Sequence, residues 1–343
     1  MQLSDFYFDL PSELIACEPL ADRAASRLLI LNKRSRSFRD SSFGDLPDLL
    51  RADDLLILNN TQVFPARLIG KTLSGAKIEI FLVKHVEKSV WQALAKPARR
   101  LQRGSLITFS KELSADVREK LPDGTVEVAL NCSGDVDALI DAYGRTPLPP
   151  YIKRDAATPD LDRERYQTIF ASRRGAIAAP TAGLHFTEGI LNRIRERGIE
   201  IAEITLHVGY GTFEPVRSKD LAAHRVAPER FEIDSQAADK LERARKASRR
   251  IVAVGTTTTR TLEYALSRSG RFCSMSGNAD LTITPGYRFR AVGAMLTNFH
   301  LPQSSLLILV STFAGHELIM RSYDHAVEAR YRFYSFGDCM FIQ

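Results

Sequence analysis

Two histidines set among glycines and threonines are the residues of this sequence whose types and spacing could do chemistry. His185 lies in the segment PTAGLHFT at 180–187, and His207 lies in LHVGYGTF at 206–213. An imidazole changes its charge near neutral pH, so each could move a proton to or from a polar substrate. A single histidine of this kind is more often a cap or a loop brace. A third one in a similar context, His300 in TNFHLP at 297–302, weakens that bland interpretation.

Zinc binding is a second chemistry that three histidines could provide. The sequence has no HExxH pattern, however, and no carboxylate recurs at the spacing of a metal ligand. Its four cysteines are scattered without a CxxC pair, which predicts neither a zinc site nor a disulfide framework. We therefore expect no metal, and free thiols that suit a reducing cytosol.

A glycine-threonine segment, GTTTT at 255–259, is placed to bind an anion. It lies between a predicted strand and a predicted helix, where free backbone N–H groups and the helix dipole favour negative charge. It is no phosphate loop, because GxxxxGK[ST] is absent, and the GYG at 209–211 supplies only part of GxGxxG. For either segment alone, ordinary turn and capping chemistry explains the residues equally well.

The elements around the two histidine loops predict a common site. The run 176–179 is strand-like, 188–197 indicates a helix stopped by Gly198, and 201–206 alternates as a strand. Both loops would then leave the ends of consecutive strands, which is the edge where ligands bind in open α/β sheets.

Two regions of the chain have the texture of an α/β domain. Continuous apolar runs at 28–31 and 54–59 are typical of strands covered on both faces. After residue 148 strands and helices alternate: we expect a helix over 235–249 capped by Ser235, a strand over 250–254, and helices over 261–266 and 316–328. The apolar run 306–310 is predicted to be a buried strand.

The middle of the chain differs, because it contains closely spaced short strands and no convincing helix. We expect these strands at 67–72, 77–86, 90–95, 105–109, 115–118 and 125–130. Such spacing favours a small antiparallel barrel or sandwich. The predicted fold class is therefore α/β: a mixed or parallel-sheet domain built from residues 1–62 and 148–343, with a small antiparallel β-barrel inserted at 63–147.

Composition bounds the function only loosely. The 343 residues are 44% hydrophobic and 26% charged, which is typical of a globular, soluble protein, and the net charge of +6 is a mild excess. Local clusters of arginine, such as Arg173-Arg174, are more often solvated faces than nucleic-acid sites. The first residues lack the regions of a signal peptide, and no apolar run could span a bilayer. We expect a cytoplasmic protein without a membrane partner.

Taken together, these segments resemble one family, the S-adenosylmethionine:tRNA ribosyltransferase-isomerases of queuosine biosynthesis. The resemblance covers nearly the full chain. Its motifs, in order, are DF at 5–6, DLP at 9–11, DR at 22–23, SRLL at 26–29, LNNT at 58–61, PARL at 65–68, PLPPYI at 147–152, RERYQT at 163–168, the two histidine loops, GTT at 255–257 with RTLE at 260–263, LTNFHLP at 296–302, YRF at 331–333 and GD at 337–338.

The resemblance implies a cytoplasmic enzyme that transfers and isomerises the ribosyl part of S-adenosylmethionine. The acceptor would be 7-aminomethyl-7-deazaguanine at the wobble position of certain tRNAs, and the products epoxyqueuosine-tRNA, adenine and methionine. S-adenosylmethionine would be a co-substrate, with no recycled cofactor and no metal. The family architecture is an α/β domain with an inserted barrel, and the protein is expected to act as a monomer.

The reaction that this resemblance implies needs acid and base groups near neutrality in a dry cleft. A sulfonium acidifies the C5′ hydrogens, and adenine leaves more readily when protonated. His185 and His207 are the predicted proton-transfer residues, with their two roles open. Residues expected to bind substrate or co-substrate are Asn59, Arg67, Thr181, Gly183, Gly209, Gly211, Thr212, Thr256, Arg260, Asn298 and His300. Arg173 and Arg174 are expected to contact tRNA.

The sequence leaves the role of Glu263, two departures from the family pattern and two alternative functions to be considered. An Arg260–Glu263 brace along one helix face is as good an interpretation of Glu263 as a catalytic role. The stretch 277–286 lacks aromatics common in the family, and Ala227 stands where a histidine is usual. A non-catalytic tRNA-binding protein and a conventional methyltransferase are the alternative functions. The intact loops argue against the first, and the missing glycine-rich Rossmann loop argues against the second.

Overall fold

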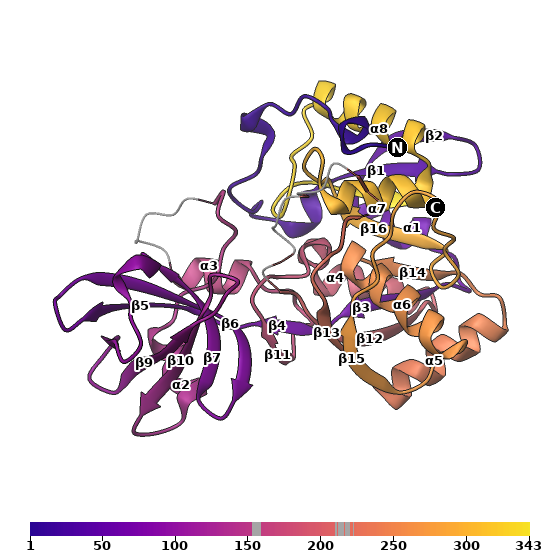
Figure 1. Ribbon diagram of the computed structural model, residues 1–343. Coiled ribbons are helices and arrows are strands. Elements are labelled where there is room, and N and C mark those ends of the chain that lie inside the picture. The colour runs from indigo at the N-terminus through magenta and orange to yellow at the C-terminus, as the bar shows by residue number, and fades with distance from the viewer. Residues whose placement is uncertain (153–158, 210, 212–215, 217–219, 222) are drawn as a thin grey trace.

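The computed structural model describes residues 1–152, 159–209, 211, 216, 220–221 and 223–343, in two parts (Figure 1). One part is a nine-stranded mixed sheet covered by helices, and the other is a closed six-stranded antiparallel barrel. The predicted fold class is thereby confirmed. No helix in the described part of the chain is both long and apolar enough to cross a membrane.

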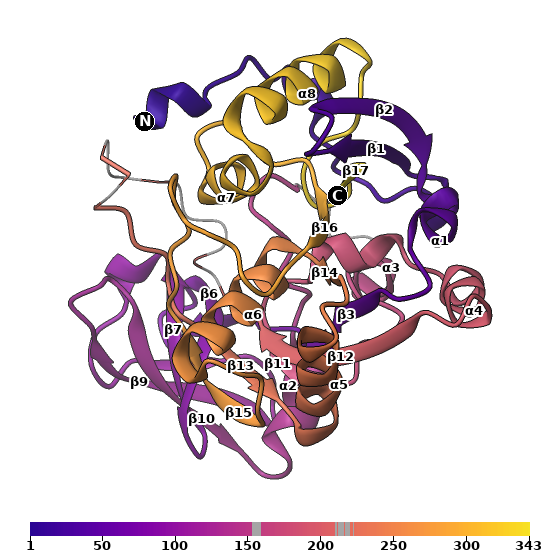
Figure 2. The ribbon, with the colours of Figure 1, turned by 90° about the vertical axis from the view of Figure 1, so that its right-hand side faces the viewer.

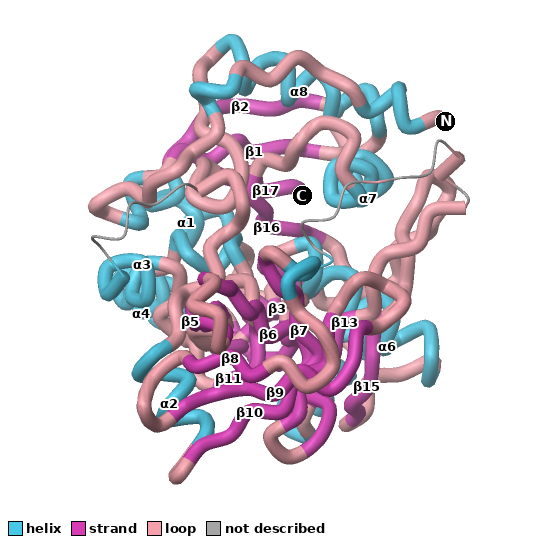
Figure 3. The backbone as a smooth tube through the Cα atoms, turned by 60° about the vertical axis from the view of Figure 1, so that its left-hand side comes forward, coloured by secondary structure: helices cyan, strands magenta, loops and turns pink. Residues whose placement is uncertain are grey.

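The large sheet brings together segments that are far apart in sequence. Its strands, in spatial order, are β15 (Met275–Ala279), β13 (Glu229–Ile233), β12 (Glu200–His207), β3 (Leu55–Asn59), β14 (Ile251–Val254), β16 (Ala294–Asn298), β17 (Cys339–Ile342), β1 (Arg27–Asn32) and β2 (Ser37–Ser42). The four central strands β12, β3, β14 and β16 are parallel, so their carboxyl ends meet at one edge. Figure 3 shows β16, β17, β1 and β2 following one another away from the barrel.

Both faces of this sheet are covered, which explains why residues 28–31 of β1 and 55–58 of β3 are all apolar. Leu29, Leu31, Leu55 and Ile57 face a core shared with four helices, whereas the alternate residues face a second core. The four helices of the first core are α5 (Ser235–Lys246), α6 (Thr256–Ser269), α7 (Ser305–Ala314) and α8 (His316–Glu328). The second core includes α1 (Leu46–Leu49) and α4 (Glu188–Glu196). Both α7 and α8 lie at the end of the molecule away from the barrel (Figures 1 and 2).

The predicted strand at 306–310 is wrong, because these residues belong to α7. The helix begins after Ser304, whose hydroxyl accepts a hydrogen bond from the Leu307 N–H at 3.2 Å. Leu307, Ile308, Leu309 and Val310 are all buried, so the run shows no polar face. A short, fully buried apolar run does not reveal its period, and periodicity alone cannot tell such a helix from a strand.

Two other helices differ at their first residues from the prediction. Helix α6 begins at Thr256, so the glycine-threonine segment forms the first turn of the helix, not a loop before it. Helix α5 is capped by Asp234, whose side chain accepts from the Ala237 N–H at 2.8 Å, and Ser235 is its first helical residue. Helix α8 spans the predicted residues.

The barrel confirms the six short strands expected in the middle of the chain. Its closed order is β10-β7-β6-β5-β8-β9, with every neighbouring pair antiparallel. The strands are β5 (Arg67–Thr72), β6 (Lys77–Glu87), β7 (Val90–Lys96), β8 (Leu106–Thr108), β9 (Leu113–Lys120) and β10 (Val126–Cys132), followed by helix α2 (Val136–Tyr143). The domain limits at 63 and 147 stay a prediction.

A small two-stranded parallel sheet lies where the chain enters and leaves the barrel region. It pairs β4 (Thr61–Val63) with β11 (Arg173–Ala176), and helix α3 (Pro159–Arg165) precedes β11. The loop of His185 therefore follows a strand of this small sheet, while the loop of His207 follows β12 of the large one. The expectation that both loops leave neighbouring strands of one sheet is corrected accordingly. Short 3-10 helices complete the chain: Leu3–Phe6, Ser12–Leu14, Arg23–Ala25, Phe43–Asp45, Ala98–Arg100 and Thr181–His185.

Candidate active site

A cleft lies at the carboxyl ends of the parallel strands and gathers several of the predicted loops. The cleft is open to solvent, and its empty volume with the mouth included is about 570 Å³. Five segments line it: residues 178–182, Val208, residues 255–257, residues 297–300 with Leu306, and residues 334–335. Of the residues predicted from the sequence, Thr181, Thr256, Asn298 and His300 are brought together here.

The amino-terminal end of α6 supplies hydrogen-bond donors to this cleft. Gly255 precedes the helix with a φ of 98°, a left-handed conformation that glycine adopts without strain. Thr256 and Thr257 form the first turn and line the cleft. Because the first N–H groups of a helix have no partner within it, this end carries a partial positive charge and can receive a ligand's acceptor.

The neighbours of Asn298 determine the orientation of its side-chain amide, and with it the direction in which the Oδ1 acceptor faces. Its Nδ2 donates to the Tyr334 carbonyl at 3.0 Å and lies 3.3 Å from the His185 Nε2. A carbonyl can only accept, so the amide nitrogen must face it and Oδ1 must face elsewhere. Oδ1 is buried and has no hydrogen-bond partner among the described residues. A buried acceptor of this kind is costly unless a ligand or water donates to it.

His185 is fully engaged by protein groups. Its Nδ1 lies 2.9 Å from the Ser26 Oγ, and the Ser26 hydroxyl donates to the Arg23 carbonyl at 3.2 Å. The serine oxygen therefore accepts from Nδ1–H, which leaves Nε2 to accept from Asn298. Burial, followed by repulsion from nearby arginines, lowers the pKa of His185 to about 4, so the ring is neutral at pH 7. His185 is buried, with only 4% of it exposed.

His207 is less buried and keeps one ring nitrogen available. Its Nδ1 lies 2.8 Å from the Thr61 Oγ1, and the Thr61 hydroxyl donates to the Arg173 carbonyl at 3.4 Å. The Thr61 oxygen thus accepts from Nδ1–H, and Nε2 has no hydrogen-bond partner within the described residues. The ring packs on Gly175, where a Cβ would come within 2.6 Å of it. Partial burial and the charge of Arg230 lower the pKa of His207.

The two loops contribute to the cleft, but their histidines do not. Residues 181–182 of the first loop and Val208 of the second line it, whereas neither imidazole is among its described lining residues. His300 does line it. Its Nε2 lies 3.1 Å from the Thr297 Oγ1, its backbone N–H donates to the Tyr323 hydroxyl, and burial lowers its pKa to about 3. The His300 imidazole is therefore a neutral part of the cleft lining.

Arg260 lies in a second, smaller cavity that shares Thr256 and Thr257 with the cleft. Its guanidinium is buried and paired with Glu229, the first residue of β13. The alternative of an Arg260–Glu263 brace is wrong, because Glu263 instead accepts from the Tyr287 hydroxyl and from the backbone N–H groups of residues 290–292. His224 also lines this cavity, and its Nε2 is buried without a hydrogen-bond partner in the described part of the chain.

Several predicted residues lie outside the cleft and brace the fold. Both amide atoms of Asn59 bond to backbone groups, Oδ1 to the N–H groups of Thr61 and Leu206 and Nδ2 to the Leu206 carbonyl. Arg67 lies in β5 of the barrel and pairs with Glu79 at 2.8 Å. Arg174 pairs with Asp141 at 2.6 Å.

The predicted glycines and the tRNA residues fall in different surroundings. Gly183 is buried, and a Cβ there would meet the Phe170 ring at 2.8 Å. A Cβ on Gly211 would meet Ala227 at 2.5 Å, whereas Gly209 has open space around it. Thr212 lies outside the described residues, and Arg173 is exposed on β11.

The residues of the site that the sequence analysis missed include Ser26, Tyr334 and Ser335. The signal that could have found them is the family resemblance. Its motif at 26–29 contains Ser26, and its motif at 331–333 directly precedes Tyr334 and Ser335. In the described part of the chain, no three His, Cys, Asp or Glu side chains are grouped as a metal ion would require.

The whole chain resembles known proteins. Residues 3–342 match a family described as "Queuosine biosynthesis protein". Proteins named S-adenosylmethionine:tRNA ribosyltransferase-isomerase from Syntrophotalea carbinolica and Thermoanaerobacter sp. are 46% and 47% identical, with 100% of both chains covered in each case. A crystal structure of S-adenosylmethionine tRNA ribosyltransferase from Thermotoga maritima is similar with a TM-score of 0.57 at 34% identity, covering 99% of this chain and 100% of that one.

Proposed function

The chain belongs to the family of queuosine biosynthesis proteins, and from this premise we propose which reaction its cleft carries out. The enzyme transfers and isomerises the ribosyl moiety of S-adenosylmethionine. The acceptor is 7-aminomethyl-7-deazaguanine at the wobble position of tRNA, and the products are epoxyqueuosine-tRNA, adenine and methionine. The protein acts as a monomer.

The observation that carries this proposal is the electrically neutral lining of the cleft. None of its described lining residues is Lys, Arg, Asp or Glu, and the partly exposed Tyr334 supplies aromatic surface. Such a lining suits a sulfonium, which can lie against an aromatic ring without a competing cation. It also suits the acceptor amine, since a weakly polar site disfavours the charged form and keeps the nitrogen nucleophilic.

His207 is the better candidate for the base of the first step. The sulfonium acidifies a C5′ hydrogen, and a base takes that proton while the ring opens and adenine departs with its bonding electrons. The Nε2 of His207 has no hydrogen-bond partner among the described residues, and partial burial lowers the pKa of the ring, which favours the neutral form that can accept a proton. The imidazole itself is not among the described lining residues of the cleft, but the next residue, Val208, is. The amine then attacks, loses its proton, and epoxide closure expels neutral methionine.

His185 and the other predicted residues support this chemistry from around the cleft. His185 acts on the reaction through Asn298, because both of its ring nitrogens are already bound. The Oδ1 of Asn298 accepts from an N–H or O–H of the substrates, and the first turn of α6 receives an acceptor. Exposed Arg173 contacts tRNA phosphate, with Arg174 held beside it by Asp141.

Product analysis tests the proposal. Purified protein is incubated with S-adenosylmethionine and tRNA that carries 7-aminomethyl-7-deazaguanine, and the small products are separated. Release of adenine and methionine in equal amounts is expected. Formation of S-adenosylhomocysteine would indicate methyl transfer instead, and tRNA binding without binding of S-adenosylmethionine would indicate the non-catalytic alternative.

A further inference from the structure

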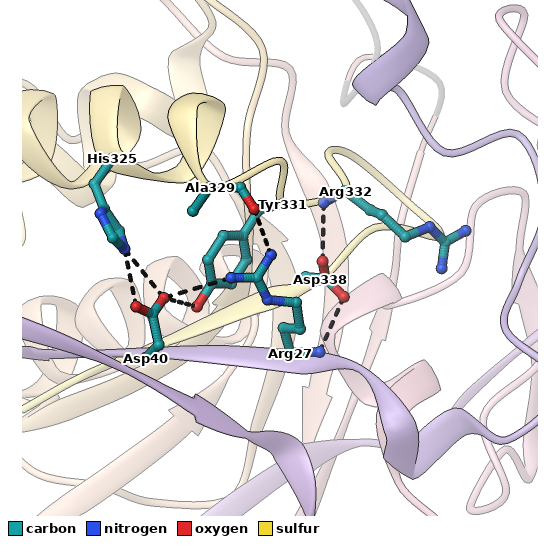
Figure 4. A network of polar contacts seen from close by, with 7 residues as sticks. All are labelled: Arg27, Asp40, His325, Ala329, Tyr331, Arg332 and Asp338. Atoms are coloured by element: carbon teal, nitrogen blue, oxygen red, sulfur yellow. Dashed lines mark hydrogen bonds and ion pairs between the residues drawn. The ribbon is translucent and has the colours of Figure 1, made fainter.

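The buried carboxylate of Asp338 ties two distant segments together behind the cleft. Its Oδ1 accepts from the Arg27 backbone N–H at 3.0 Å, and its Oδ2 accepts from the Arg332 backbone N–H at 2.8 Å (Figure 4). Only 1% of Asp338 is exposed, and it is not among the lining residues of the cleft. Burial raises the pKa of this carboxyl, so a carboxylate here is costly and its two bonds are what offset that cost.

The first segment leads to one side of His185. Both polar groups of the peptide between Ser26 and Arg27 are hydrogen-bonded. The Arg27 N–H donates to Asp338, and the Ser26 C=O accepts from the Phe43 N–H at 2.9 Å. Ser26 places its Oγ against the His185 Nδ1. The ring of Phe43 packs 5.3 Å from the imidazole, centre to centre. Fixing this one peptide therefore fixes two contacts of the ring.

The second segment leads to the other side of the same ring. Arg332 and Asp338 close a tight loop, in which the Asp338 N–H also donates to the Arg332 carbonyl at 2.8 Å. The loop needs Gly337, because a Cβ there would lie 2.4 Å from the Arg332 carbonyl oxygen. It presents the carbonyl of Tyr334 to the Asn298 amide, which in turn contacts the His185 Nε2.

We propose that Asp338 is a positioning residue of this enzyme: through two separate arms it holds His185 and Asn298 in the one arrangement that leaves the Asn298 Oδ1 free for substrate. This inference rests on the proposed function for its activity readout. A carboxylate suits the task because it offers an acceptor to each of two N–H groups. An amide offers one acceptor and would leave the other N–H unpaired.

The same network contains a matched control. Asp40 accepts from the Tyr331 hydroxyl and the His325 Nε2 and lies 3.6 Å from the Arg27 guanidinium (Figure 4). It joins β2 to α8, and none of these partners lines the cleft. Asp40→Asn is therefore the same chemical change, next to the same arginine, without an arm to His185.

The experiment compares Asp338→Asn with Asp40→Asn. We expect Asp338→Asn to lower kcat for adenine release at least about tenfold while KM for tRNA stays within about twofold, as loss of positioning predicts. Asp40→Asn is expected to keep kcat within about twofold, even where its Tm falls. Equal kcat in the two variants would overturn the proposal.

A spectroscopic readout keeps the inference separate from the proposed reaction. In protein labelled with 15N-histidine, the ring nitrogens of His185 should report a single neutral Nδ1–H tautomer in wild type and in Asp40→Asn, and a mixture in Asp338→Asn. An unchanged tautomer in Asp338→Asn would refute the two arms. Absence of adenine release by wild type would instead refute the proposed function. Where Asp338→Asn shows no cooperative unfolding, Asp338→Glu, with a displaced carboxylate, takes its place with the same expected outcomes.

Discussion

Replacing Asn298 by aspartate tests the orientation of its amide with one atom. In the wild type, the Asn298 Nδ2 lies 3.0 Å from the Tyr334 carbonyl oxygen and 3.3 Å from the His185 Nε2. In Asn298→Asp, a carboxylate oxygen takes the place of this donor and faces the same two acceptors. Two lost hydrogen bonds cost about 1–3 kcal/mol, and an unpaired buried oxygen adds about 1–3 kcal/mol. The free energy of unfolding should thus fall by about 2–6 kcal/mol near pH 7.

The pH dependence of this loss has a definite sign. Burial against acceptors should raise the pKa of the new carboxyl above the value of about 4 of the unfolded chain. Below about pH 4 the group is protonated in both states and can donate its O–H to the Tyr334 carbonyl. As the pH rises from there toward the raised folded pKa, stability is lost, so the variant's deficit should widen between about pH 4 and about pH 8.

Urea unfolding followed by circular dichroism, at several pH values, measures that deficit. Asn278→Asp is the control, because Asn278 is exposed on β15 and the substitution adds the same charge. Its deficit should be small and nearly independent of pH. If Asn298→Asp matched this control, the amide nitrogen would not face the two acceptors, and the assignment of a free Oδ1 would be refuted.

Three further predictions concern other parts of the site. His207→Gln should abolish adenine release while shifting Tm little, since the ring is only partly buried; turnover near that of wild type would remove His207 as the base. Burial lowers the pKa of His185 to about 4 and of His300 to about 3, both below the unfolded value of about 6.5. Their contribution to stability is present above that value and lost as the pH falls, so the Tm of the wild type should decrease below about pH 6.5. In His300→Gln the Tm should decrease less steeply with falling pH, and an equally steep decrease would contradict this account. Gly337→Ala should lower the free energy of unfolding by about 2 kcal/mol or more through its backbone clash, whereas Gly134→Ala, with open space around it, should not; equal urea midpoints would contradict the tight loop.

Local patterns predicted the elements whose period is visible in the sequence. The six barrel strands alternate between a buried core and the exterior, and residues 316–328 show a helical stripe, so both were found. The run at 306–310 was misassigned because it is buried on all sides and its period is hidden. The candidate loops were found by residue type, since glycine, threonine and histidine are unusual together at strand ends.

The contacts that organise the site could not be predicted in the same way. His185 meets Ser26 and Asn298, which are 159 and 113 residues away, and no local pattern encodes such pairs. Arg260 illustrates the same limit. A helical spacing of three suggested Glu263 as its partner, but the sheet brings Glu229 closer, and tertiary packing decides. Which side of a loop faces the cleft likewise depends on the strand before it.

The place of β17 in the large sheet has a consequence for how the protein is made on the ribosome. This strand lies between β16 and β1 and pairs with both. Strands β1 and β2 are synthesised some 300 residues before it, and among the described strands only β17 joins them to the sheet. Until Cys339–Ile342 leave the exit tunnel, the β1–β2 hairpin cannot join the sheet. The edge of β1 that will pair with β17 is then unpaired and accessible to chaperones and to other nascent chains. The barrel, whose strands all lie between residues 67 and 132, can close long before.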